Sequence, residues 1–228
     1  MADRPILFSA PMVLALLADT KTQTRRVMKP QPFESGYFDG DVELTVIPAN
    51  DQWPKAFRFN AEAVGGDAIL GEIFEPRISE GDRLWVRETL KADSNDQAAR
   101  WITYGADGAV TPHGLVRWDW KRDSIPSIHM PRWASRLTLT VTDVRVERLQ
   151  DISEADAQAE GAVPYYCAAS KLDTYGPSHA MCGCDHRAGF CLIWEKINGI
   201  ESWDANPWVT VYAFSVEKQN IDLIERAA

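Results

Sequence analysis

Alternating apolar and polar positions along the chain predict two long strands. Residues 137–141 alternate aliphatic side chains with threonines, and residues 208–216 show the same period of two. This alternation is typical of a strand with one buried face. After residue 141 the apolar phase slips by one position, to Val144 and Val146. A slip of one residue inside a strand predicts a β-bulge there.

Apolar residues at helical spacing predict three short helices. The first covers residues 12–17 and follows Ser9, whose hydroxyl we expect to cap it. The second begins with a capping-box pattern at residues 151–154 and ends before Gly161, and the third covers residues 188–197. Short runs of β-branched or apolar residues predict further strands at 6–8, 21–27, 42–47, 83–88, 101–104 and 116–120.

These elements predict one domain over residues 1–228, of the α+β class and mostly β. The expected architecture is a small, mixed β-barrel with flanking short helices. Segments rich in proline and glycine near 31–80 and 91–132, and a cysteine-rich loop near 165–187, are predicted to be long inserted loops. With 45% hydrophobic and 25% charged residues, the composition is that of a folded domain and not of a disordered chain.

Charge and hydropathy exclude some classes of partner. The formal net charge of −9 argues against a broad polyanion-binding surface, although a local basic cleft remains compatible with it. The sequence contains no apolar run as long as a membrane helix needs, and it does not begin like a secretory signal. We therefore expect a cytoplasmic protein with no membrane partner.

The segment from residue 20 to residue 32 is the most basic part of this acidic chain and contains no carboxylate. It carries Lys21, Thr24, Arg25, Arg26 and Lys29. Cations beside a hydroxyl suit an anionic or carbonyl-bearing ligand, and a buried lysine of lowered pKa can activate a threonine nucleophile. The alternative is a solvated, basic strand edge.

A second basic stretch, residues 117–148, interleaves arginines with tryptophans. Rings and guanidinium groups of this kind suit unstacked bases and phosphates, and Trp133 and Arg136 are the candidates there. Alternatively, these are amphipathic strands with tryptophans in the core and arginines facing solvent. Glu88, next to Arg87, is a further candidate carboxylate at the site, and its alternative role is an ion pair.

Four cysteines gather near the C-terminal third of the chain: Cys167, Cys182, Cys184 and Cys191. In a reducing compartment such a cluster indicates a metal before it indicates disulfides. We expect one structural zinc ion, with His179 or His186 as a substitute for one cysteine, and no organic cofactor. Unligated thiols, or disulfides formed after purification, are the alternatives.

Three of these patterns together resemble a known family. The run Lys21-Thr-Gln-Thr24-Arg-Arg26 after a short capped helix is similar to the signature of the ASCH family, the activating-signal-cointegrator homology domain of PUA-like fold. The Gly81-Asp82 turn and the run Ala157-Gln-Ala-Glu160-Gly161 resemble two further motifs of that family, in its order. Residues 128–136 resemble its larger, phage-borne members. The matching pieces cover less than half of the chain, and Asp19 stands near a usual glycine of the family.

The resemblance implies a fold associated with RNA or modified nucleosides. Small bacterial members include amidohydrolases that deacetylate N4-acetylcytidine with a lysine, a threonine and a glutamate, which correspond here to Lys21, Thr24 and Glu160. Thr24 would attack the amide carbonyl, Lys21 would take and return the proton, and Glu160 would orient Lys21. Without the resemblance, Glu160 is equally well a plain helix residue beside a glycine cap.

The predicted function is thus removal of an acyl group from N4-acylated cytidine or a related modified base. The expected partner is a modified nucleoside or a short single-stranded nucleic acid. The residues expected to bind it are Arg25, Arg26, Glu88, Trp133 and Arg136. Two alternatives use the same basic cleft: a non-catalytic module that binds RNA or a modified base, and a ribonuclease.

Overall fold

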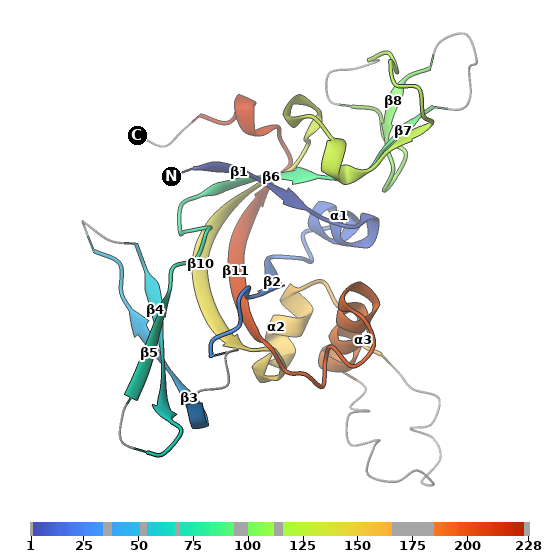
Figure 1. Ribbon diagram of the computed structural model, residues 1–228. Helices are drawn as coiled ribbons and strands as arrows, with labels where there is room; N and C mark the ends of the chain where they lie inside the picture. Colours follow the sequence, from blue (N-terminus) through green and yellow to red (C-terminus); the bar gives the residue numbers. More distant parts are fainter. Residues whose placement is uncertain are drawn as a thin grey trace, which may run out of the picture.

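A five-stranded sheet forms the centre of the molecule (Figure 1). The computed structural model describes residues 2–33, 38–50, 54–66, 69–93, 100–111, 116–165 and 185–225. The strands follow the order β1 (Asp3–Leu7), β6 (Arg83–Arg87), β10 (Thr138–Arg148), β11 (Trp208–Glu217) and β2 (Gln23–Val27). β1 and β6 are parallel, and the other neighbours are antiparallel. The predicted class, α+β and mostly β, is confirmed.

The sheet is open, with β1 and β2 at its edges, and no backbone ladder joins these two strands within the described residues. The closed barrel expected from the sequence is therefore not formed by strand pairing. Instead, the Arg26 guanidinium of β2 donates a hydrogen bond of 2.8 Å to the carbonyl oxygen of Leu7, at the end of β1. A side chain, not a ladder, connects the two edges at this point.

The predicted bulge lies in β10, where the register with β11 shifts between Val141 and Asp143. Because side chains alternate between faces, the extra residue returns Val144 and Val146 to the face already occupied by Leu139 and Val141. All four are buried in one core cluster. The long strand can therefore curve, as Figure 1 shows, while it keeps one apolar face.

Helices lie beside this sheet at its β2 edge. α1 (Ala10–Leu17) connects β1 to β2, while α2 (Glu154–Ala159) and α3 (His186–Asn198) pack together near the ends of β10 and β11 (Figure 1).

The predicted caps need correction. Ser9 stands at the N-cap of α1, but its side chain makes no capping hydrogen bond. α2 is capped by Ser153, which accepts from the Asp156 N–H, because Asp151 belongs to a preceding 3₁₀ turn.

The first insertion folds into its own antiparallel sheet, formed by β3 (Phe38–Ile47), β4 (Ala56–Ala63) and β5 (Ile69–Phe74). Phe57 and Phe59 of β4 are buried in the central core cluster, so this sheet is anchored to the domain. In Figure 1 it stands beside β10.

The second insertion contains β7 (Leu90–Ala92), β8 (Ile102–Tyr104) and β9 (Ser124–Ile125), followed by the 3₁₀ turns η1 (Ser127–His129) and η2 (Arg132–Ala134). The strand predicted at 116–120 is wrong, since Arg117 makes only an isolated bridge with Trp101. The reason is Trp118, which buries its ring and donates its indole N–H to the Arg122 carbonyl. The chain winds around this side chain instead of extending along a neighbour.

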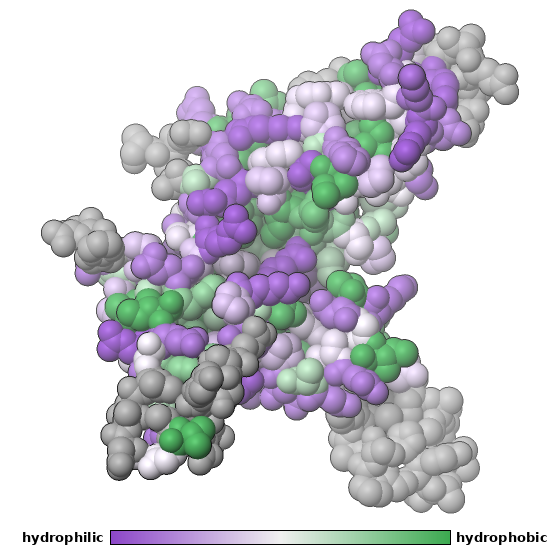
Figure 2. Space-filling model, viewed as in Figure 1, coloured by the Kyte–Doolittle hydropathy of each residue, from purple (hydrophilic) through white to green (hydrophobic). Residues whose placement is uncertain are grey.

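On the face drawn in Figure 2, polar residues cover most of the surface, and apolar residues gather in a hollow near the centre. No helix in the described part of the chain has the length and apolar character needed to span a bilayer.

Candidate functional site

The end of α1 directs the chain toward the site by a tight turn. The Thr20 N–H donates to the Ala15 carbonyl and the Asp19 N–H donates to the Leu16 carbonyl, which is the Schellman pattern of a helix C-terminus. Asp19 adopts a left-handed φ of 57°. Aspartate tolerates this conformation better than most residues, so Asp19 occupies the backbone geometry that a glycine would have.

The end of α2 repeats this turn and meets the end of α1. The Ala162 N–H donates to the Ala157 carbonyl, and Gly161 has a φ of 83°. A Cβ atom on Gly161 would lie 3.0 Å from the Ala15 Cβ and 3.3 Å from the Lys21 Cβ. A glycine therefore allows the two helix ends to approach so closely that Lys21 and Glu160 form a backbone bridge.

Lys21 and Glu160 form a buried ion pair at this junction. The Lys21 Nζ lies 2.7 Å from the Glu160 Oε2 and 2.8 Å from the Glu160 carbonyl oxygen. Lys21 is 0% exposed and Glu160 is 7% exposed. Burial lowers the pKa of Lys21, and the charge and hydrogen bond of Glu160 oppose this effect only in part. The pair therefore contains an amine that deprotonates more easily than an exposed lysine.

Arg25 holds the other side of the Glu160 carboxylate. Its Nη1 lies 3.1 Å from the Glu160 Oε1, and its Nη2 lies 2.6 Å from the Glu147 Oε1. The side chain of Arg25 has no exposed surface, and its guanidinium is paired with these two carboxylates. In this structure Arg25, predicted to bind substrate, orients Glu160.

Thr24 and Arg26 lie on the opposite face of β2 from Arg25, as expected for alternate positions of a strand. The Arg26 guanidinium lies 5.4 Å from the centre of the Phe8 ring, and the Lys21 Nζ lies 5.7 Å from the same centre. Lys21 and Arg26 therefore contact the same ring, although Lys21 precedes the strand, which begins at Gln23. Phe8 was not predicted as a site residue.

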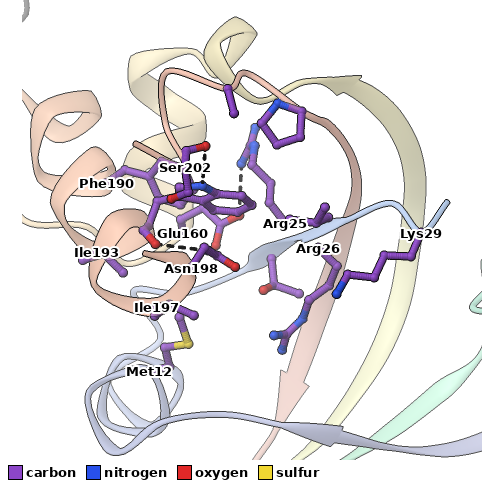
Figure 3. A pocket seen from close by; sticks show the side chains of 15 residues that line it. Met12, Arg25, Arg26, Lys29, Glu160, Phe190, Ile193, Ile197, Asn198 and Ser202 are labelled. Carbon is purple, nitrogen blue, oxygen red and sulfur yellow. Dashed lines mark hydrogen bonds and ion pairs between the residues drawn. The ribbon is translucent and has the colours of Figure 1, made fainter. Parts of the chain in front are cut away.

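A pocket of about 460 Å³ opens beside these residues, lined by Thr24, Arg25, Arg26 and Glu160 from the predicted set. Figure 3 shows Met12 and Ile197 on one side of it and Arg26 on the other. Lys21 is not part of this lining, but its amine contacts the carboxylate of Glu160, which is. The Thr24 side chain is 2% exposed and makes no hydrogen bond to the other described residues.

One wall of the pocket comes from α3 and was missed by the sequence analysis. Its lining residues there are Phe190, Ile193, Trp194 and Ile197. They follow one another at helical spacing, so the apolar stripe of the predicted helix was the signal available. The stripe alone does not distinguish a pocket wall from a core contact.

Glu88 and Arg136 form a separate cluster and do not line this pocket. Arg136 makes two hydrogen bonds to the buried Glu88 carboxylate, at 2.8 and 2.9 Å, and also pairs with Asp107. Its guanidinium lies 3.8 Å from the centre of the Tyr104 ring. Glu88 therefore lies in an ion pair, which is the alternative role given for it above. Trp133, on η2, is 38% exposed and likewise lies outside the pocket lining.

Other arginines of the second basic stretch also hold carboxylates. Arg132 pairs with Asp3 and Asp222, and Arg145 pairs with Glu147 and Asp156. Trp118 is buried in the core of the second insertion. Trp118 therefore has the core position of the alternative interpretation, while Arg132 and Arg145, expected there to face solvent, pair with carboxylates instead.

Three of the four predicted zinc ligands, Cys167, Cys182 and Cys184, lie outside the described residues, as does His179. Cys191 is half-buried on α3, and burial, followed by nearby carboxylates, raises the pKa of its thiol to about 11. Within the described ranges no three potential metal ligands are grouped. The zinc site stays a prediction, which elemental analysis of protein purified without chelator tests.

Neither a protein-family model, nor a curated protein, nor a solved structure matches this chain.

Proposed function

We propose that this protein is an amidohydrolase that removes the acyl group from N4-acylated cytidine or a related modified base. The observation that carries the proposal is the buried pair of Lys21 and Glu160, with Glu160 and Thr24 in the lining of one pocket. A binding module would use the lysine charge to contact its ligand. Here the Lys21 Nζ is buried and both of its hydrogen bonds go to Glu160, an arrangement that supports proton transfer more than ligand binding.

The hydrogen bonds of Lys21 suit a general base. A neutral amine has two N–H groups and one lone pair, and Glu160 offers two acceptors, its Oε2 and its carbonyl oxygen. When both acceptors are used, the lone pair remains for a third direction. The lowered pKa of Lys21 makes the neutral form accessible at a smaller cost than for an exposed lysine.

The proposed reaction begins with attack of the Thr24 hydroxyl oxygen on the acyl carbonyl carbon, while its proton passes to the neutral Lys21 amine. The Arg26 guanidinium stabilises the negative oxygen of the tetrahedral intermediate. The C–N bond then breaks, and Lys21 returns the proton to the departing exocyclic amine of the base. Lys21 then deprotonates a water molecule, whose oxygen attacks the acyl-threonine. As the bond between the acyl carbon and the Thr24 oxygen breaks, Lys21 returns this proton to that oxygen, which releases the carboxylic acid and restores Thr24 and the neutral amine.

The volume and the lining of the pocket support the proposed substrate. Its volume of about 460 Å³ lies within the usual range for small-molecule sites. Aromatic and aliphatic side chains of α3 face the charged residues of β2 across it, so a planar base has an apolar wall and a polar edge. The motifs similar to the ASCH family, at residues 21–26, 81–82 and 157–161, support the same assignment.

The test compares Thr24→Val with Thr22→Val in the hydrolysis of N4-acetylcytidine, followed by chromatography. Valine keeps the shape of threonine and removes only the hydroxyl, which forms no hydrogen bond within the described residues, so the melting temperature should not change. Loss of the nucleophile should lower kcat at least roughly 100-fold. Thr22 is exposed, and its variant should keep full activity.

Retained turnover in Thr24→Val would exclude Thr24 as the nucleophile. Binding of cytidine derivatives by the unmodified protein without any turnover would instead indicate a non-catalytic module, and cleavage of short RNAs would indicate a ribonuclease.

A further inference from the structure

A second cavity, of about 680 Å³, adjoins the proposed base pocket. Arg26, Val27 and Lys29 line both cavities, so the end of β2 and the residues after it separate one from the other. The far wall of the second cavity contains Phe74, Glu75, Arg77 and Ile78, which connect the inserted sheet to β6. The insertion therefore extends the site beyond the space for one base.

The charges around this cavity are strongly unbalanced. Among the described residues that line it, four are cationic, Arg4, Arg26, Lys29 and Arg77, and one, Glu75, is a carboxylate. Arg4 pairs with Asp82 at 3.3 Å. For Arg26, Lys29 and Arg77, no carboxylate of the described residues lies within ion-pair distance.

This imbalance is unusual in a protein with a net charge of −9. Elsewhere, Arg83 pairs with Asp3, and Arg136 pairs with Glu88. Cations around one concavity that have no carboxylate partner among the described residues raise the local concentration of anions there, even on an acidic molecule. Arginine and lysine in such a place suit the oxygens of a phosphate group.

We propose that the second cavity binds a phosphate attached to the ribose of the substrate, so that the enzyme acts on a nucleotide in preference to a free nucleoside. This inference rests on the proposed function, because it places the acylated base in the first pocket. Arg26 lies at the junction of the two cavities, and Arg77 and Lys29 supply further positive charge to the phosphate.

The experiment measures kcat/KM for N4-acetylcytidine, its 5′-monophosphate, its 3′-monophosphate and a trinucleotide that contains it. The phosphorylated substrates should be hydrolysed about tenfold more efficiently than the nucleoside, since one charge-assisted hydrogen bond contributes roughly this factor. The advantage should decrease as salt concentration rises. The two monophosphates and the trinucleotide show which phosphate position the cavity accepts.

The variant Arg77→Ala should abolish this advantage and leave hydrolysis of the nucleoside unchanged, since Arg77 does not line the base pocket. Arg58→Ala is the matched control: Arg58 is an exposed arginine of β4 in the same insertion and is absent from the cavity lining. It should retain the preference.

Equal hydrolysis of nucleoside and nucleotides would overturn the phosphate site and leave the proposed function intact. If no acylated substrate is hydrolysed, the proposed function fails, and binding of cytidine and cytidine monophosphate then tests the cavity by itself. Tighter binding of the monophosphate that is lost in Arg77→Ala would support the phosphate site, and equal binding would refute it.

Discussion

The buried pair of Lys21 and Glu160 gives a quantitative prediction for Glu160→Gln. The substitution preserves the shape of the side chain and removes its charge. Glu160 contacts Lys21 through Oε2 and Arg25 through Oε1, so both cations lose a charged partner. Removal of one partner of a buried ion pair costs about 3–5 kcal/mol, because the remaining charge stays buried without compensation. We expect a loss of this size in the free energy of unfolding at neutral pH.

This loss in the free energy of unfolding should change with pH, and the lowered pKa of Lys21 determines the direction of the change. Burial lowers the pKa of folded Lys21 below its reference value of 10.5, and Glu160 opposes that shift. Between the folded pKa and 10.5 the unfolded chain binds more protons, so stability rises with pH in this window. Without the Glu160 charge the folded pKa falls further and the window widens. The deficit of Glu160→Gln relative to the unmodified protein should therefore shrink as pH rises.

Urea unfolding followed by tryptophan fluorescence, at about pH 7 and about pH 9.5, measures this difference. Glu147→Gln is the control, since Glu147 contacts Arg25 at 2.6 Å but makes no contact with Lys21. Its carboxylate is partly exposed, so we expect a loss of about 1–2 kcal/mol that is the same at both pH values. Equal, pH-independent losses in the two variants would refute the argument that Lys21 carries the effect.

Three further predictions follow from the same geometry. Gly161→Ala should destabilise the protein by about 1–3 kcal/mol in thermal unfolding, and Gly108→Ala by less. Both glycines have a positive φ, but of the two only Gly161 lacks space for a Cβ atom. Equal effects would contradict the close contact of Gly161 with Ala15 and Lys21. Arg136→Lys should lower the free energy of unfolding by about 1–3 kcal/mol in the same assay, since lysine cannot make both hydrogen bonds to the Glu88 carboxylate. The control is Arg117→Lys, at an exposed pair with Asp119 of 3.9 Å, which should cause no measurable loss. Finally, kcat/KM for N4-acetylcytidine should rise with pH along a limb whose midpoint lies below 10.5, as neutral Lys21 accumulates; a rate independent of pH would exclude Lys21 as the base.

Most of the central sheet could be predicted because its strands carry their own pattern. The alternation at 208–216 and the phase slip after residue 141 correspond to β11 and to the bulge of β10. Both are local signals, since the side chains of a strand alternate whatever the strand pairs with. The insertions were less predictable, because a buried residue such as Trp118 determines the local path of the chain through contacts that its neighbours in sequence do not reveal.

The sequence alone indicated Lys21, Thr24 and Arg26 as candidates, because an acid-free basic segment is visible in the order of residues, whereas Glu160 was added by the resemblance to the ASCH family. Only the tertiary structure showed that Lys21 and Glu160, which are 139 positions apart, form a buried pair. It likewise separated Arg25, which orients Glu160, from Arg26, which lies between two cavities. The physical reason is that burial and pairing depend on which distant segments meet, and here two helix ends with left-handed turns bring them together.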